Sequence, residues 1–181
     1  MGIDGSRHII EHMMGMLGLN LDKKIQNFSD ICSIGFRRLM NSLDNKATNA
    51  RYMTVSKSGE TFETKDAMIR IKNMLENEIK AQYPRASRKE IEERVAKHLI
   101  AITDKDPNKS SLRTMANKEN WLGQELQIHD GVGCRYSAFD DHVLLSLASS
   151  GMKKADMIDM LKAASAMSEM SMNPQLSKIW H

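Results

Sequence analysis

The chain has 181 residues, of which 41% are hydrophobic and 27% charged, and 26 Lys and Arg against 23 Asp and Glu give a net charge of +3. This length predicts one domain with a core, and the apolar fraction excludes overall disorder. The small net charge gives no indication of a nucleic-acid partner, and no apolar run approaches the ~18 residues of a membrane-spanning helix. No secretory signal is recognisable, and Cys32 and Cys134 lie far apart. We therefore expect a reducing, cytoplasmic location without a disulfide framework.

The N-terminal part of the chain contains two helical patterns. The first predicts a helix from Ser6 to Leu17, after a glycine-containing turn at residues 2–5. The second predicts a helix from Cys32 to Leu43, in which apolar residues recur at helical spacing and Cys32 falls on the buried face. Between the two, residues 24–28 are compatible with a short strand.

The middle of the chain alternates between strand and helix patterns. Arg51–Val55 is a short β-favouring run, and a loop rich in hydroxyl groups follows it. A long helix comes next, ends before Pro84 and keeps one apolar face, formed by Met68, Ile71, Leu75 and Ile79. Ser87 and Glu90 have the spacing of a capping box, which predicts the start of another helix. Leu99–Thr103 is predominantly apolar, as expected of a strand that is buried on both faces.

The C-terminal part is predicted to be mostly helical. A short helix is expected near Ser110–Lys118, and residues 126–128 are compatible with one more strand before a turn at 130–133. Two further helices are expected at Ala138–Ser149 and Lys153–Met170, the second rich in methionine, which indicates a core or a hydrophobic interface. Strands that alternate with helices predict an α/β fold with a parallel sheet.

The loop after the first of the clear strands has the properties of an anion site. Its hydroxyl donors are Ser56, Ser58 and Thr61, Lys57 adds a positive charge, and Gly59 permits a tight turn. Free N–H groups at the start of the following helix also favour an anion, so the loop suits a phosphate monoester. Ser, Thr and Gly are equally common at ordinary turns and helix caps, and no Walker pattern is present. Spacing alone leaves both interpretations open.

Four segments resemble the glucose-6-phosphate isomerase family, whose enzymes contain sugar isomerase (SIS) domains. Tyr52–Thr64 resembles the family's phosphate-binding loop, and residues 2–6, Gly-Ile-Asp-Gly-Ser, resemble its GIGGS turn. Residues 98–120 resemble the strand, loop and helix that follow, and residues 130–137 resemble its VGGRYS signature. The four segments occur in the order of the family and extend the resemblance over residues 2–170.

The resemblance implies a fold, an activity and ligands. The fold would be a three-layer α/β sandwich with a parallel sheet, flavodoxin-like and lacking its first strand, over residues 1–172. Residues 173–181 would be an irregular tail that leads toward an absent second SIS domain. The family's reaction is the reversible aldose–ketose isomerisation of glucose 6-phosphate and fructose 6-phosphate in glycolysis and gluconeogenesis, without a metal or an organic cofactor. We expect these sugar phosphates as ligands, no nucleic acid or membrane as partner, and a homodimer or complementation by a C-terminal half.

The resemblance also implies roles for particular residues. The phosphate group would be held by four residues of the loop: Ser56, Lys57, Ser58 and Thr61. Ser6 would face the substrate, and Arg135 would stabilise the enediolate, since a guanidinium keeps its charge and offers directional donors. The family's catalytic Glu, His and Lys have no counterpart in the chain, so we expect it to bind a sugar phosphate without turnover.

Two residues depart from the family's pattern, and two other functions stay open. Asp4 replaces the middle glycine of GIGGS, where its carboxylate would repel an anionic substrate or cap the following helix. Cys134 replaces the glycine before the arginine and adds a Cβ where close approach was allowed. The alternatives are a non-catalytic SIS module that senses a sugar phosphate and an inactive truncated product. His8 and His12 share a helical face, but no further ligand accompanies them, so no metal site is expected.

Overall fold

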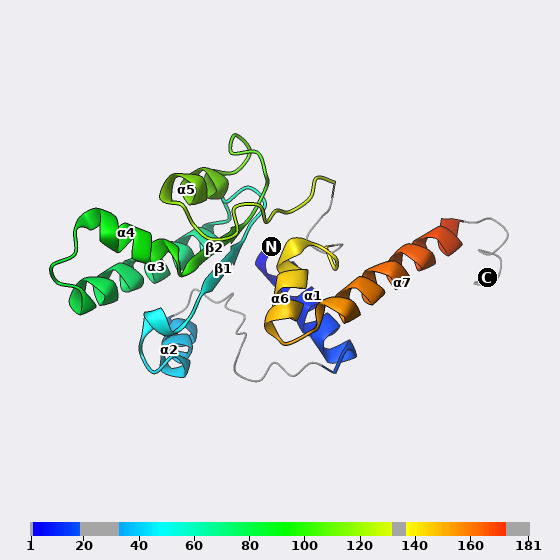
Figure 1. The fold of residues 1–181 in the computed structure, drawn as a ribbon, viewed down its shortest axis with the longest axis horizontal. Coiled ribbons are helices and arrows are strands. Elements are labelled where there is room, and N and C mark those ends of the chain that lie inside the picture. Colours follow the sequence, from blue (N-terminus) through cyan, green and yellow to red (C-terminus); the bar gives the residue numbers. More distant parts are fainter. Residues whose placement is uncertain (1, 19–32, 132–136, 173–181) are drawn as a thin grey trace.

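The computed structural model describes residues 2–18, 33–131 and 137–172, and only the backbone of residues 2–8 and of Ser33. Its elements in chain order (Figure 1) are α1 (Gly2–Met16), α2 (Ser33–Ser42), the 3-10 helix η1 (Ala47–Asn49), β1 (Tyr52–Val55), α3 (Phe62–Gln82), α4 (Arg88–Ala96), β2 (Leu99–Ile102), α5 (Ser111–Glu119), α6 (Asp141–Ser149) and α7 (Lys154–Met172). Several predictions lie outside the described residues: the strand at 24–28, the tail 173–181, Cys32, Cys134 and Arg135, and the side chains of Asp4, Ser6 and His8.

Two parallel strands form the sheet of the molecule. Tyr52 pairs with Leu99 and Val55 pairs with Ile102, so β1 and β2 are matched along their whole length. β2 is buried at three of its four positions, as its apolar sequence predicts. Within the described residues the sheet has these two strands alone. The parallel α/β arrangement is therefore confirmed, whereas the three-layer sandwich is not observed in that part of the chain.

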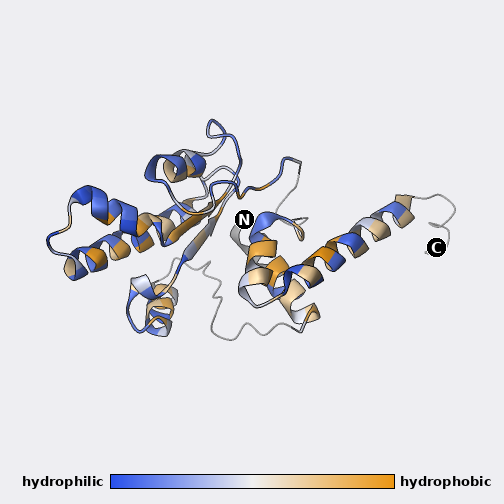
Figure 2. Cartoon of the chain, viewed as in Figure 1, coloured by the Kyte–Doolittle hydropathy of each residue, from blue (hydrophilic) through white to orange (hydrophobic). Residues whose placement is uncertain are grey.

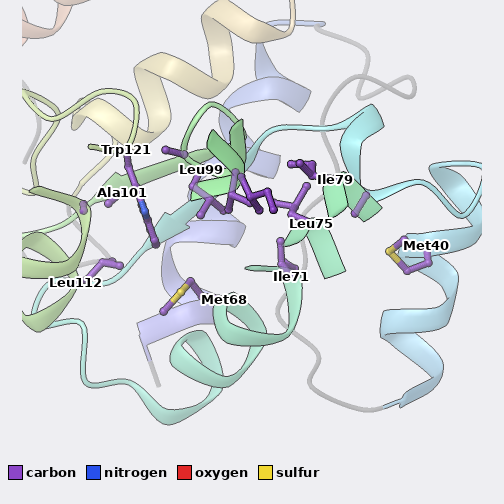
Figure 3. Packing of buried hydrophobic residues seen from close by; sticks show 14 residues of the cluster. Met40, Met68, Ile71, Leu75, Ile79, Leu99, Ala101, Leu112 and Trp121 are labelled. Carbon is purple, nitrogen blue, oxygen red and sulfur yellow. The ribbon is translucent and has the colours of Figure 1, made fainter. Parts of the chain in front are cut away.

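A hydrophobic core joins β2 to the helices around it. The apolar face predicted for α3 is buried as a whole, and Leu75 at its centre is 0% exposed. Figure 3 shows this face beside Leu99 of β2 and Trp121, which follows α5. Ile91 and Val95 of α4 belong to the same core. Burial of each large apolar side chain stabilises the fold by ~1.5–3 kcal/mol. Because these side chains come from both the sheet and the helices, the core holds β1 and β2 against α3, α4 and α5.

A side-chain cap precedes α4, and a backbone turn precedes α6. The Ser87 hydroxyl accepts the N–H of Glu90 at 3.3 Å, and the Glu90 carboxylate accepts the N–H of Ser87 at 2.7 Å. The predicted capping box is therefore confirmed. α6 begins later than the sequence predicts, because a turn closed by the Asp140 N–H and the Ser137 carbonyl precedes it.

Two local predictions are wrong. Residues 126–128 form no strand and make a single bridge to Thr103. A turn closed by the Leu126 N–H and the Gly123 carbonyl at 3.0 Å precedes them, so the segment meets the edge of the sheet only at Gln127. The Arg113 guanidinium also donates to the Leu126 carbonyl. Residues 2–5 belong to the first turn of α1 rather than to a glycine turn. Glycine permits a turn, but it does not require one.

A second, smaller cluster holds α1 against α6. Its buried side chains are Ile10, Met14, Val143 and Leu147. Met152 and Met160 pack against them, which confirms the prediction of a hydrophobic contact for these two methionines. Met167, Met170 and Met172 are exposed instead. α7 has no buried residue, extends away from the rest of the molecule (Figure 1) and mixes polar and apolar residues along its length (Figure 2).

Candidate functional site

The loop between β1 and α3 is closed by the hydroxyl group of Ser56. This residue is 7% exposed, and its N–H donates to the carbonyl of Ile102 at 3.1 Å, which extends the parallel pairing beyond β1. The Ser56 Oγ accepts the N–H of Gly59 at 3.1 Å and lies 3.3 Å from the Oγ1 of Thr61. The loop therefore folds around one buried hydroxyl, which brings Thr61 back beside the end of the strand.

Glycine is required at position 59 for two reasons. Its φ of +75° lies in the left-handed region, and a Cβ there would meet the backbone nitrogen of Leu112 at 2.5 Å. The close approach is fixed by a hydrogen bond from the Ser111 N–H to the Ser58 carbonyl at 3.1 Å. The loop after β1 is consequently packed directly on the first turn of α5.

The loop after β2 is hydrogen-bonded to the loop after β1. The Lys57 carbonyl accepts the N–H of Asp104 at 3.0 Å and the hydroxyl of Thr103 at 2.9 Å. Ser110 contacts the Thr103 hydroxyl and caps α5 by accepting the N–H of Arg113 at 3.2 Å. The N-terminal ends of α3 and α5 thus lie together at the carboxyl edge of the two parallel strands. This edge is the usual position of a ligand in parallel α/β folds, and helix N-termini favour anions.

The start of α3 keeps polar groups that its own side chains do not satisfy. The Thr61 side chain makes no cap hydrogen bond to the helix. The first N–H groups of α3, including that of Phe62, have no acceptor within the helix. The hydroxyl of Thr64, in the same turn, is buried and has no hydrogen-bond partner within the part of the chain that the structure describes. A bound oxyanion could accept from donors of this kind.

Charged side chains of both signs surround the loop. Lys57 lies 3.9 Å from the carboxylate of Asp130, and Lys109 lies 3.7 Å from the other oxygen of that carboxylate. Glu60 lies 3.3 Å from the ammonium of Lys65. Hydrogen bonds from Ser111 and then from Lys65 lower the pKa of the Glu60 carboxyl. Glu60 is therefore ionised and already paired, which partly offsets its repulsion of an anionic ligand.

A buried arginine holds the segment that carries Asp130. Arg113 is 2% exposed, and its guanidinium donates to the carbonyls of Asp104 at 3.2 Å and Gln124 at 2.6 Å, besides that of Leu126. Burial lowers the pKa of Arg113, although the charge of Asp104 works in the opposite direction. Each of these contacts goes to a backbone carbonyl, so Arg113 is a structural brace and not a ligand-binding group.

Two histidines lie near the contact between this segment and the start of α6: His129 in the segment and His142 in α6. His129 is exposed, and its Nδ1 contacts the carboxylate of the buried Asp140; this hydrogen bond raises the pKa of His129. His142 is buried against Ser137 at 3.2 Å, and burial lowers its pKa. The other oxygen of Asp140 is buried without a hydrogen-bond partner among the described residues. His129 therefore joins the segment at 127–131 to the start of α6.

The structure brings together four of the residues that the sequence singled out. The loop between β1 and α3 carries Ser56, Lys57, Ser58 and Thr61. Within it, the Ser58 hydroxyl accepts the N–H of Glu60 at 3.2 Å. The backbone of Ser6 lies in α1, and neither its side chain nor Arg135 is described. Within the described residues, no group of three or more metal-ligating side chains occurs, and none of the helices is long and apolar enough to cross a membrane.

Sequence reasoning missed the charged groups that the tertiary structure adds to the loop. Lys109 and Asp130 are far from Lys57 in the chain, and nothing in their local pattern distinguishes them from solvated surface residues. The resemblance of residues 98–120 and 130–137 to family segments was the signal that could have directed attention to both. Arg113 lies in the first of these segments as well, but an arginine in an amphipathic helix is usually exposed, so the sequence did not predict its burial.

The fold and this site define a mostly helical α/β protein with a parallel strand pair and a polar loop at its carboxyl edge. No family model matches the chain. Over 135 residues, 75% of the chain, it is 28% identical to the glucose-6-phosphate isomerase of Acaryochloris marina. That match covers 22% of the relative, so the chain spans about a fifth of its length. The sequence is therefore distantly and partially related to glucose-6-phosphate isomerase.

A solved structure has a similar fold. The crystal structure of hypothetical protein TT0462 from Thermus thermophilus superposes with a TM-score of 0.60 at 23% identity. The similarity covers 95% of this chain and 41% of that chain. At this identity the likeness shows the fold alone, and it includes both the body around the sheet and the α1–α6 pair.

Proposed function

We propose that the loop between β1 and α3 binds the phosphate group of glucose 6-phosphate or fructose 6-phosphate, as the phosphate-binding half of an aldose–ketose isomerase. One observation carries this proposal: two loops and two helix N-termini meet at the carboxyl edge of the parallel strands, with Lys57 and the hydroxyl groups of Ser58 and Thr61 on the side of the first loop. The distant relation to glucose-6-phosphate isomerase gives the class of ligand.

The donors of the loop suit a phosphate dianion. Lys57 supplies a mobile positive charge, and Ser58 and Thr61 supply hydroxyl groups at either side of the turn. The first N–H groups of α3 add partial positive charge along the helix axis. Ser56 is buried and bonded to Gly59, so its part is to hold the shape of the loop that carries the other donors.

The reaction itself would depend on groups beyond this loop. Moving a proton between adjacent carbons of the sugar builds negative charge on oxygen, and we assign Arg135 to stabilise that enediolate. Ser6 would contact the substrate from α1. We assign no described residue as the general base, and we expect the chain alone to bind sugar phosphate without isomerising it.

Calorimetry with fructose 6-phosphate, fructose and inorganic phosphate tests the proposal on the full chain. We expect fructose 6-phosphate and phosphate to bind and fructose to give no heat. Lys57→Met should weaken the binding of fructose 6-phosphate about tenfold, because a charge-assisted hydrogen bond contributes roughly 1.5 kcal/mol or more. Lys80→Met is the matched control: it removes the same charge from the other end of α3, where Lys80 is exposed and paired with Glu76.

Three results would contradict this function. Equal heats for fructose and fructose 6-phosphate would exclude phosphate recognition, and equal losses in Lys57→Met and Lys80→Met would exclude the loop as the site. Binding of neither phosphate compound by folded protein would reject the proposal as a whole. A coupled isomerase assay with robust turnover would overturn the expectation that the chain binds only.

A further inference from the structure

Two lysines from different loops hold one carboxylate at the candidate phosphate site. Lys57 belongs to the loop after β1 and Lys109 to the loop after β2, and their ammonium groups lie 3.9 and 3.7 Å from the two oxygens of Asp130. The side chains of Lys57, Lys109 and Asp130 are 42%, 58% and 76% exposed. A position at which two ammonium groups converge on one carboxylate is by its chemistry an anion position.

The segment that presents Asp130 is anchored by the two residues that precede it. Before it, the Ile128 N–H donates to the Thr103 carbonyl at 2.9 Å, and Ile128 itself is 4% exposed. Next to it, His129 contacts the buried Asp140. Thr103 also bonds the Lys57 carbonyl, so one residue ties the first lysine's loop to the segment that carries Asp130. The carboxylate is therefore tethered close to both lysines and does not meet them by chance.

We propose that Asp130 is an internal anion that occupies a two-lysine position of the phosphate site, so that a phosphate ligand must displace it to be held by both Lys57 and Lys109. The inference rests on the proposed function, and it adds Lys109 as a second binding cation and Asp130 as a competitor. A phosphate dianion carries more charge than a carboxylate and presents three oxygen acceptors, so it can replace Asp130 between two ammonium groups.

Titration of Asp130→Asn with inorganic phosphate and with fructose 6-phosphate tests the inference. Removing the competing charge should tighten phosphate binding about twofold to fivefold at low salt, the range of an exposed ion pair. The gain should shrink as ionic strength rises. Glu93→Gln is the matched control, because it removes one carboxylate of an exposed ion pair on α4. We expect it to leave the affinity unchanged.

A double-mutant cycle separates displacement from a general change of charge. If Asp130 pairs with Lys109 and so keeps it from phosphate, then Lys109→Met should weaken phosphate binding more in the Asp130→Asn background than in the original chain. If Asp130 only lowers the local potential, the two effects will be additive, which would overturn the inference. Weaker binding of fructose 6-phosphate by Asp130→Asn would also overturn it, since the carboxylate would then hold the sugar.

The inference and the proposed function can fail separately. Should the original chain bind phosphate while Asp130→Asn binds it no better, displacement is wrong and the proposed function stands. Should neither chain bind phosphate or fructose 6-phosphate, both are wrong. Binding by Asp130→Asn alone would support displacement and would mean that the internal carboxylate is the dominant occupant of the site.

Discussion

The body around the sheet and the α1–α6 pair are built in different ways. The body uses elements that follow one another from α2 to α5, and its core joins residues between Met40 and Trp121. The α1–α6 pair joins Ile10 and Met14 to Val143 and Leu147, which are more distant in sequence. Contacts between distant segments require a larger loss of chain entropy before they stabilise anything. The candidate site lies on the region whose contacts span the shorter stretch of chain.

The long helices of the two regions show the same contrast. α3 buries a complete apolar face, whereas α7 has no buried residue even though Ile158, Leu161 and Met167 lie on it. Both helices form, and only the one that has a strand and two helices beside it acquires a buried side. Formation and burial of a helix are therefore separate properties, and the second depends on what packs against it.

Substitution of one fully buried leucine in each region should give the largest effect. Leu75 and Leu147 are both 0% exposed. We expect Leu75→Ala to lower the free energy of unfolding by about 2–5 kcal/mol, because a cavity opens in the larger core. Leu147→Ala should instead release α1 and α6 and leave the body folded. Hydrogen exchange followed by mass spectrometry measures both, and equal loss of protection throughout the chain in the two variants would remove the distinction.

Gly59→Ala is expected to damage the site more selectively. The left-handed φ alone costs about 1–2 kcal/mol for a residue with a Cβ, and contact with Leu112 adds to it. Thermal unfolding should show the loss of stability, and calorimetry should show loss of phosphate binding. Gly15→Ala in α1 is the control, since a Cβ there meets nothing within 4 Å. It should raise stability by about 0.5–1 kcal/mol. A Gly59→Ala variant with unchanged binding would contradict the described loop.

Ser87→Ala should give a smaller, local effect in the body. It removes the hydroxyl that accepts the Glu90 N–H, and loss of such a cap costs about 1 kcal/mol. Urea unfolding with an unchanged slope is the measurement. Because α4 lies away from the loop after β1, phosphate affinity should stay the same. Reduced affinity in this variant would show that the start of α4 and the site are coupled.

The smallest expected effect is a pH dependence that divides two histidines. The raised pKa of His129 means that its contact with Asp140 stabilises the fold below its ordinary pKa of 6.5 and is lost as pH rises through the raised value. The lowered pKa of His142 has the opposite sign, so its contribution is present above 6.5 and is lost as pH falls.

Chemical unfolding between pH 5 and 8 checks this division, with His129→Gln as the variant. We expect the variant to lose only the decline on the alkaline side and to keep the decline on the acidic side. An unchanged alkaline limb in His129→Gln would mean that the contact with Asp140 does not contribute.

Much of the fold could be predicted because its signals are local. The apolar face of α3, the capping box at Ser87 and the apolar run of β2 each depend on residues within a few positions of one another, and all three are confirmed. The strand expected at 126–128 failed because a turn at Gly123–Leu126 precedes it, and Arg113, a residue of another element, bonds the Leu126 carbonyl. A short apolar run cannot report that a distant side chain will take its carbonyl groups.

For the candidate site, the sequence by itself determined the hydroxyl groups, Lys57 and the need for Gly59, since these lie on one continuous loop. Only the tertiary structure placed the start of α5 against that loop and brought Lys109 and Asp130 to Lys57. The physical reason is the separation along the chain over which each effect acts. Backbone conformation and capping are set by neighbours in the chain, whereas the electrostatic field at a site is set by charges that folding brings together.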